Sequence, residues 1–150
     1  MKKYWEDYQL GERAVSPGKT VTEAALTMCI GLGGYLLPLF LDEEFAKKTR
    51  AGGRIAPGRV TFLLMGGLSE QCHLFDLDTM IALLSVDRIA FPAPVRPGDT
   101  IRVEIEITAN RETSKPDRGI IVHKETCWNQ RNELVVESEG THLVMRRPRQ

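Results

Sequence analysis

The stretch Ile101-Arg102-Val103-Glu104-Ile105-Glu106-Ile107-Thr108 decides the fold class, because apolar and polar residues alternate along it. Successive side chains of a β-strand point to opposite faces, so the pattern predicts a long strand with one buried and one wet face. Three further strands are predicted at residues 84–91, 119–130 and 134–145. The second half of the sequence therefore reads as a run of long antiparallel strands.

Before these strands, apolar residues recur at the spacing of a helix. Thr20 or Thr22 is expected to cap a first helix, and Asp42 a short second helix. That second helix has acidic residues in its first turn and basic residues in its last, which complements the helix dipole. Helices followed by a run of strands indicate an α+β fold.

The longest predicted helix covers about residues 60–75 and is apolar nearly all round, as expected for a helix inside a fold. Its Gly66-Gly67 pair lowers the helix propensity by about 1 kcal/mol per glycine relative to alanine. We interpret the pair as a sign that something packs very close to this helix backbone.

Length and composition limit the classes of protein that fit. The 150 residues suit one domain, over residues 1–150, and 20 basic residues balance 20 acidic ones. A net charge of zero argues against nucleic-acid and anionic-membrane partners. The three cysteines form no CxxC pair, which favours a reducing compartment without a disulfide or metal framework. Residues 24–41 are uncharged but are interrupted by glycines and Pro38, so we expect a cytoplasmic protein without a membrane span.

Six short segments follow one another along the chain: YWED (4–7), GE (11–12), SPGKTVTE (16–23), DEEFA (42–46), GGRIA (52–56) and FPAPVRPGDT (91–100). Together they resemble the MaoC-like dehydratases, a family that includes the (R)-specific enoyl-CoA hydratases. The resemblance implies a single hotdog domain, in which an antiparallel sheet wraps around a long central helix. It also implies a homodimer or larger assembly, with an acyl-CoA or acyl-carrier thioester in a tunnel near the subunit interface.

The sequence departs from this family where the chemistry is expected. Residues 34–42 match the signature Gly-Asp-x-Asn-Pro-x-His-x-Asp, whose Asp and His activate the water that adds to a 2-enoyl thioester. Tyr35 stands at the Asp position, Leu37 at the Asn position and Phe40 at the His position. Pro57 replaces the usual histidine of a second segment, before Gly58. We therefore assign no catalytic residue to the family dyad.

Loss of the dyad leaves binding as the favoured function. A phenol with a pKa of about 10 is a poor base at neutral pH, and Leu37 and Phe40 cannot carry a proton. The Gly58 N–H is expected to bind the thioester carbonyl, with Pro57 beside it. Tyr35, Leu37 and Phe40 are expected to line the acyl pocket, and Arg96 to meet a CoA phosphate. The CoA thioester is then the ligand, and no cofactor or metal is expected.

Other interpretations stay open. The same residues also fit helix capping, core packing and surface ion pairing, and His73, His123 and His142 fit structural roles. One function is a thioester-binding partner of a catalytic MaoC-like subunit. The alternative is an active enzyme with non-standard residues, either a hydratase or dehydratase using Tyr35 or a thioesterase using Asp42 or Glu43. A hotdog kept for assembly alone is the third.

Overall fold

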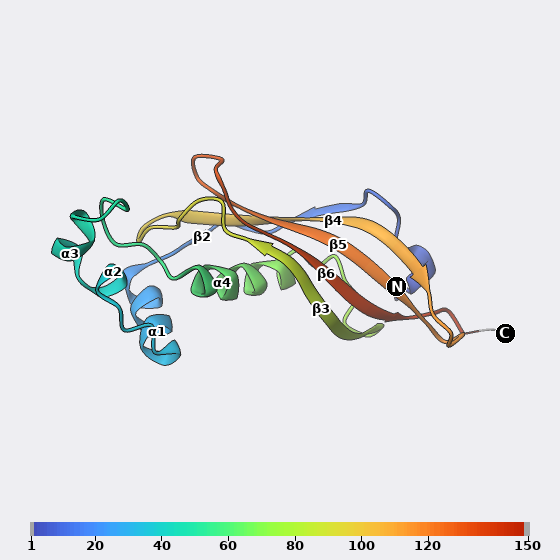
Figure 1. Cartoon of the computed structure of the whole chain (residues 1–150). Coiled ribbons are helices and arrows are strands. Elements are labelled where there is room, and N and C mark those ends of the chain that lie inside the picture. The colour runs from blue at the N-terminus through green and yellow to red at the C-terminus, as the bar shows by residue number, and fades with distance from the viewer. Residues whose placement is uncertain (1, 149–150) are drawn as a thin grey trace.

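A computed structural model describes residues 2–148 and shows the predicted run of strands as one antiparallel sheet (Figure 1). The expected domain of residues 1–150 therefore includes Met1, Arg149 and Gln150, which lie outside the described residues. The sheet order is β1-β4-β5-β6-β3, and β2 also pairs with β4. The strands are β1 (Arg13–Val15), β2 (Lys19–Thr20), β3 (Met80–Ala90), β4 (Thr100–Glu112), β5 (Arg118–Asn129) and β6 (Leu134–Met145).

The four long strands confirm the predicted pattern, with β3 beginning four residues before the predicted start at residue 84. In β4, the apolar residues of the alternating stretch are buried and the polar ones are partly exposed. The two short strands β1 and β2 were not expected from the sequence. They are too short to show a period of two, and they form by pairing with β4.

The helices are η1 (Trp5–Asp7), α1 (Glu23–Gly33), α2 (Pro38–Leu41), α3 (Glu43–Lys47) and α4 (Gly58–Glu70). Two helices, α1 and α3, begin at predicted caps, and the long helix predicted at about residues 60–75 begins two residues earlier and ends at Glu70. Thr22 caps α1, because its hydroxyl accepts the Ala25 N–H at 3.2 Å, and Thr20 lies in β2 instead. Asp42 caps α3 by accepting the Phe45 N–H at 2.9 Å. Both side chains accept hydrogen bonds from N–H groups that the helix itself leaves unpaired.

Helix α4 lies along the concave side of the curved sheet, while α1, α2 and α3 gather beyond one end of it (Figure 1). Its buried residues are Val60, Thr61, Met65 and Leu68. Val60, Met65 and Leu68 belong to the same core as the buried side chains of β4 and β5. This confirms the expected arrangement of a sheet around a central helix.

Only one side of α4 is buried in this way, which corrects an expectation. Leu63 is 60% exposed, and a Cβ atom added at Gly66 or Gly67 would meet no atom within 4 Å. Within residues 2–148 no atom packs close to these glycines, so the predicted close approach is not made inside this chain. The buried side of the helix packs into the core, and the side that carries the glycines is left open.

Apolar side chains are also exposed on β3 and near α1. Strand β3 pairs with β6 along one side and stands at the end of the strand order. Its exposed apolar residues are Ile81, Leu83, Leu84 and Ile89, and those around α1 are Met28, Leu32, Leu36 and Leu37. Apolar surface of this extent is typical of an association site. Among the described helices, none is long and apolar enough to cross a membrane.

Candidate functional site: a cavity beneath the central helix

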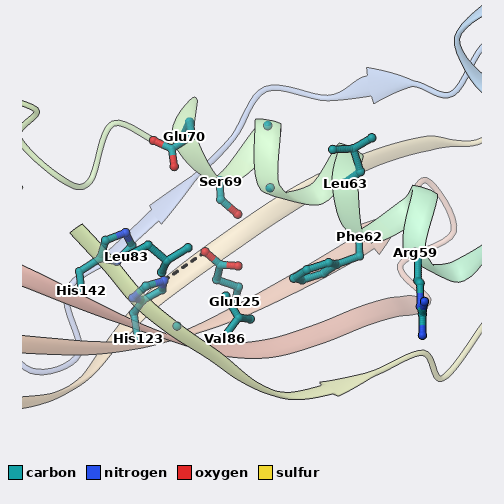
Figure 2. Close-up of a pocket in the computed structure, with 13 residues that line it drawn as sticks. Arg59, Phe62, Leu63, Ser69, Glu70, Leu83, Val86, His123, Glu125 and His142 are labelled. Atoms are coloured by element: carbon teal, nitrogen blue, oxygen red, sulfur yellow. Dashed lines mark hydrogen bonds and ion pairs between the residues drawn. The ribbon is translucent and has the colours of Figure 1, made fainter. Parts of the chain in front are cut away.

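A cavity of about 540 Å³ lies between α4 and the sheet (Figure 2). Helix α4 lines it from its first turn to its last, and three strands close the other side. Most of the lining is apolar or glycine, with charged and polar groups at the two ends. The lining residues are Arg59, Phe62, Leu63, Gly66, Gly67, Ser69, Glu70, Leu83, Val86, His123, Glu125, Gly140 and His142.

A histidine–glutamate pair stands in the wall of this cavity. His123 and Glu125 are two residues apart on β5, so their side chains share one face of the sheet. The Nε2 atom of His123 lies 3.1 Å from Oε1 of Glu125, as the dashed line in Figure 2 marks. The Ser138 hydroxyl donates to Oε2 of the same carboxylate at 3.3 Å. The carboxylate is therefore held in place from two sides.

His142 of β6 completes the cluster by stacking on His123. Their ring centroids are 4.9 Å apart with an angle of 24° between planes, and Phe75 contacts both rings. The register of β5 and β6 places Gly140 directly opposite His123. A Cβ atom at residue 140 would lie only 2.4 Å from the His123 ring, so the glycine makes room for it.

The electrostatic environment sets the charges of two of these groups. Burial acts to raise the pKa of Glu125, but hydrogen bonding and charge interaction with His123, supported by serine hydroxyls, outweigh it and hold the pKa below its usual value. Burial, together with the neighbouring His123, lowers the pKa of His142 to about 4. At neutral pH, Glu125 is therefore a carboxylate and His142 is an uncharged imidazole.

The cluster contains polar atoms without partners. Both His123 and His142 bury an Nδ1 atom that has no hydrogen-bond partner among residues 2–148. Leaving such an atom unpaired away from water costs about 1–3 kcal/mol. No group of three or more His, Cys, Asp or Glu side chains in the described part of the chain is arranged to hold a metal ion.

The predicted thioester-binding residues lie near the first turn of α4. The Pro57 carbonyl accepts the N–H groups of Val60 at 2.9 Å and Thr61 at 3.0 Å. The N–H groups of Gly58 and Arg59 come before these two and lie outside the helical ladder. The Phe91 ring covers the α-carbon of Gly58, since an added Cβ would approach it to 3.2 Å.

Tyr35, Leu37, Phe40 and Arg96, which were predicted to contact the ligand, do not line this cavity. Arg59 is the arginine in its wall. Tyr35 and Phe40 pack partly against the core, and Leu37 is 57% exposed. The guanidinium of Arg96 donates to the Ala51 carbonyl.

The two carboxylates considered for a thioesterase, Asp42 and Glu43, have structural partners. Asp42 caps α3, and Glu43 accepts from Nε of Arg54 at 2.8 Å. Arg54 is also paired with Glu23, so its charge is already balanced. Burial raises the pKa of the Cys72 thiol to about 11 and that of Cys127 to about 12, so neither is a thiolate near neutral pH.

The sequence interpretation missed the His123, Glu125 and His142 cluster, since both histidines were read as sheet residues. A local signal was present in the spacing of His123 and Glu125, which places them on one face of a strand. The position of His142 beside them depends on strand pairing and has no local signal.

Comparison with known proteins decides the family. The sequence model of the MaoC-like domain matches residues 9–129 of this chain. The chain belongs to the MaoC-like dehydratase family. It is 28% identical to an (R)-specific enoyl-CoA hydratase of Rhodospirillum rubrum over 94% of this chain and 91% of that protein. It is 29% identical to Protein MaoC of Klebsiella aerogenes over 87% of this chain, and the match spans only 37% of that longer protein.

Solved structures of other proteins share the fold. A monoamine oxidase regulatory protein from Archaeoglobus fulgius superimposes with a TM-score of 0.91 at 32% identity, over 98% of this chain and 97% of that one. A HadBC (3R-hydroxyacyl-ACP dehydratase) complex from Mycobacterium tuberculosis matches with a TM-score of 0.72 over 89% of this chain and 96% of that one. At 22% identity, it shows the fold alone. The α+β architecture of this MaoC-like protein is the hotdog fold of its structural neighbours.

Proposed function

We propose that this MaoC-like protein binds an acyl-CoA or acyl-carrier thioester and does not hydrate it through the family's Asp and His pair. One observation carries the proposal. The N–H groups of Gly58 and Arg59 lie outside the helical ladder, and Arg59, the second residue of α4, stands in the wall of a mainly apolar cavity. Free N–H groups at a helix N-terminus suit a carbonyl oxygen, and the cavity suits an acyl chain.

The residues at the family's catalytic positions support binding without hydration. Tyr35 and Phe40 are half-buried against the core, and Leu37 offers no proton to exchange. In this proposal Tyr35, Leu37 and Phe40 form apolar surface near the thioester, and Pro57 starts the helix that binds it. Arg96 contributes positive charge for a CoA phosphate. The thioester is the ligand, and no separate cofactor is required.

Without the dyad, this MaoC-like protein is proposed to act as the partner of a catalytic MaoC-like subunit. Its structural neighbours include a dehydratase complex described as HadBC, in which two kinds of chain are named together. We propose a homodimer, or a hetero-oligomer with an intact MaoC-like subunit, formed through the exposed apolar surface of β3 and α1. Co-purification with such a subunit would support the partner role. A homo-oligomer that never associates with one would contradict it.

Calorimetry with crotonyl-CoA and dodecanoyl-CoA tests binding, and chromatography of the mixtures tests turnover. We expect both thioesters to bind and to be recovered unchanged. Arg96→Gln should weaken the binding of dodecanoyl-CoA but not of dodecanoyl-pantetheine, which lacks the CoA phosphates. Absence of binding would overturn the proposal, and formation of 3-hydroxyacyl-CoA or free CoA would show an enzyme instead.

A second candidate function is an active hydratase, dehydratase or thioesterase with non-standard residues. The His123–Glu125 pair in the cavity wall favours it, because a carboxylate that orients a histidine is a common acid–base arrangement. However, Glu125 engages Nε2 of His123, and Nδ1 of the same ring is buried. Neither nitrogen is then free to face a substrate. Turnover that is abolished in Glu125→Gln would establish this candidate.

A further inference from the structure

The cavity has two chemically different ends. Arg59 lies at the end formed by the first turn of α4, where the proposed function places the thioester. His142, Glu125 and Ser69 lie toward the other end (Figure 2). Phe62, Leu63 and the open backbone at Gly66 and Gly67 lie between them. An apolar path therefore connects a thioester-binding end with a polar end.

The length of α4 sets the distance between these ends. Ser69 lies eleven positions after Gly58, and a helix rises about 1.5 Å per residue, which gives roughly 16 Å. A fully extended chain advances about 1.2 Å per bond, as in an extended polypeptide of three bonds per residue. An acyl chain from the thioester end thus reaches the polar end after roughly 13 bonds.

The polar end has hydrogen-bonding capacity that the protein does not use. Glu125 is ionised, so its oxygens only accept hydrogen bonds, and two oxygens have more lone pairs than His123 and Ser138 occupy. His142 is uncharged and offers one N–H and one lone pair. It is 6% exposed, and because its Nδ1 is itself buried, Nε2 is the ring nitrogen left to meet a ligand. A purely apolar chain end would leave these groups unsatisfied.

We infer that the acyl chain carried by this protein bears a hydroxyl group about a dozen bonds from the thioester, and that Glu125 and His142 bind this hydroxyl. A hydroxyl donates one hydrogen bond and accepts others, which matches an acceptor-only carboxylate beside an uncharged imidazole. This inference rests on the proposed function and specifies its substrate class.

Other terminal groups fit the site less well. A carboxylate would meet the negative charge of Glu125 at close range in a partly dry site. An ammonium group would pair with Glu125 but would lose its hydration and leave N–H groups without acceptors. A methyl end would gain no hydrogen bond. The site therefore discriminates among chain ends by their hydrogen-bonding capacity as well as their length.

Calorimetry with dodecanoyl-CoA, 12-hydroxydodecanoyl-CoA and the CoA monothioester of dodecanedioic acid tests the inference. We expect the hydroxylated chain to bind roughly tenfold more tightly than dodecanoyl-CoA, as a hydrogen bond to a charged group implies, and the dicarboxylic chain to bind more weakly than both. A short pair, 6-hydroxyhexanoyl-CoA and hexanoyl-CoA, should show no such preference, because the hydroxyl does not reach Glu125. This length test needs no variant protein.

Two variants locate the effect. Glu125→Gln should reduce the preference for the hydroxylated chain to about twofold or less, because the charged acceptor is lost. Glu104→Gln makes the same change on β4, outside the cavity wall, and should keep the preference at its full size.

The possible failures are distinguishable. If no dodecanoyl thioester binds, the proposed function fails and the inference fails with it. If dodecanoyl-CoA and its hydroxylated form bind equally, the inference is wrong while thioester binding stands. A preference that persists in Glu125→Gln, or tighter binding of the dicarboxylic chain, also overturns the inference.

Discussion

At the scale of single residues, the cavity wall depends on the close packing of His123 against Gly140. His123 is buried between Phe75, His142 and the backbone at Gly140, so its ring has no space to move. The ring position in turn fixes the carboxylate of Glu125 at 3.1 Å. A change of one methyl group at this point therefore affects both packing and hydrogen bonding.

Gly140→Ala should destabilise the protein by about 1–3 kcal/mol, the usual cost of overpacking a filled site. The physical reason is the 2.4 Å approach of the new Cβ to the His123 ring. Urea denaturation of the variant measures the loss. The double variant with His123→Ala should show a smaller additional cost of the Gly140 change, because the obstructing ring is gone. An unchanged free energy of unfolding in Gly140→Ala would refute the packing described here.

His142 makes stability depend on pH. Its folded pKa of about 4 lies below the ordinary value of 6.5, so between these values the unfolded chain binds a proton that the folded protein does not. Stability should be greatest above pH 6.5 and fall by up to about 3 kcal/mol as the pH drops to 4. Glu125 causes a further loss of stability at lower pH. Its pKa is lowered in the folded protein, so the stability that its carboxylate contributes is lost as the pH falls and the group is protonated.

His142→Phe should flatten the pH dependence of the free energy of unfolding between pH 6.5 and 4, while retaining aromatic packing on Phe75. Denaturation at several pH values in this window provides the measurement. His73→Asn is the matched control, because His73 is exposed and asparagine tolerates its positive φ of 51°. Equal slopes in the parent and in His142→Phe would contradict the assignment.

At the scale of elements, α4 has two functions in this fold. One side supplies core residues against the sheet, and its glycine side forms the open wall of the cavity. Its first turn presents the N–H groups of Gly58 and Arg59, and its length sets the distance to the polar cluster. The helix thus carries both the stability of the domain and the geometry of the proposed ligand path.

Gly66→Ala should stabilise the protein by about 0.5–1 kcal/mol, because alanine restricts the unfolded chain and favours the helix. The new Cβ would meet no atom within 4 Å. Thermal unfolding of the variant tests this, with Gly34→Ala as a contrast. Gly34 has a φ of 70°, so alanine there should destabilise by about 1 kcal/mol. Destabilisation by Gly66→Ala would show that a partner molecule packs against α4.

At the scale of the whole molecule, exposed apolar surface is concentrated on β3 and around α1. An edge strand with free backbone groups and exposed leucines is a ready surface for pairing with another chain. The MaoC-like family relationship leads us to expect association there. The oligomeric state is therefore the property of the assembled molecule to measure first.

Sedimentation should show a dimer at micromolar concentration, and Leu84→Lys on β3 should weaken it by about 100-fold or more, because a charge is then buried at the interface. Leu84 is 51% exposed in the single chain. Leu10→Lys makes the same change at a residue that is 68% exposed and outside β3, and it should leave the dimer intact. A parent protein that sediments as a monomer would refute the expected assembly.

The sequence by itself determined the strands, the helix starts and the family. Alternation along residues 101–108, the caps at Thr22 and Asp42, and the segments shared with MaoC-like proteins are local features. They act through side-chain direction and through hydrogen bonds within a few residues. For the same reason, β1 and β2 were missed, because two short segments become strands only by pairing with β4.

Only the tertiary structure decided where a ligand fits. The cavity exists because no side chain fills the space between Gly66, Gly67 and the strands that line it, which the apolar pattern of the helix did not indicate. His123 and His142 are 19 positions apart and stack because β5 and β6 pair in one register, with Gly140 opposite His123. Burial then lowers the pKa of His142, and the His123 partner holds down that of Glu125. These properties depend on contacts between distant residues, so the folded chain alone defines them.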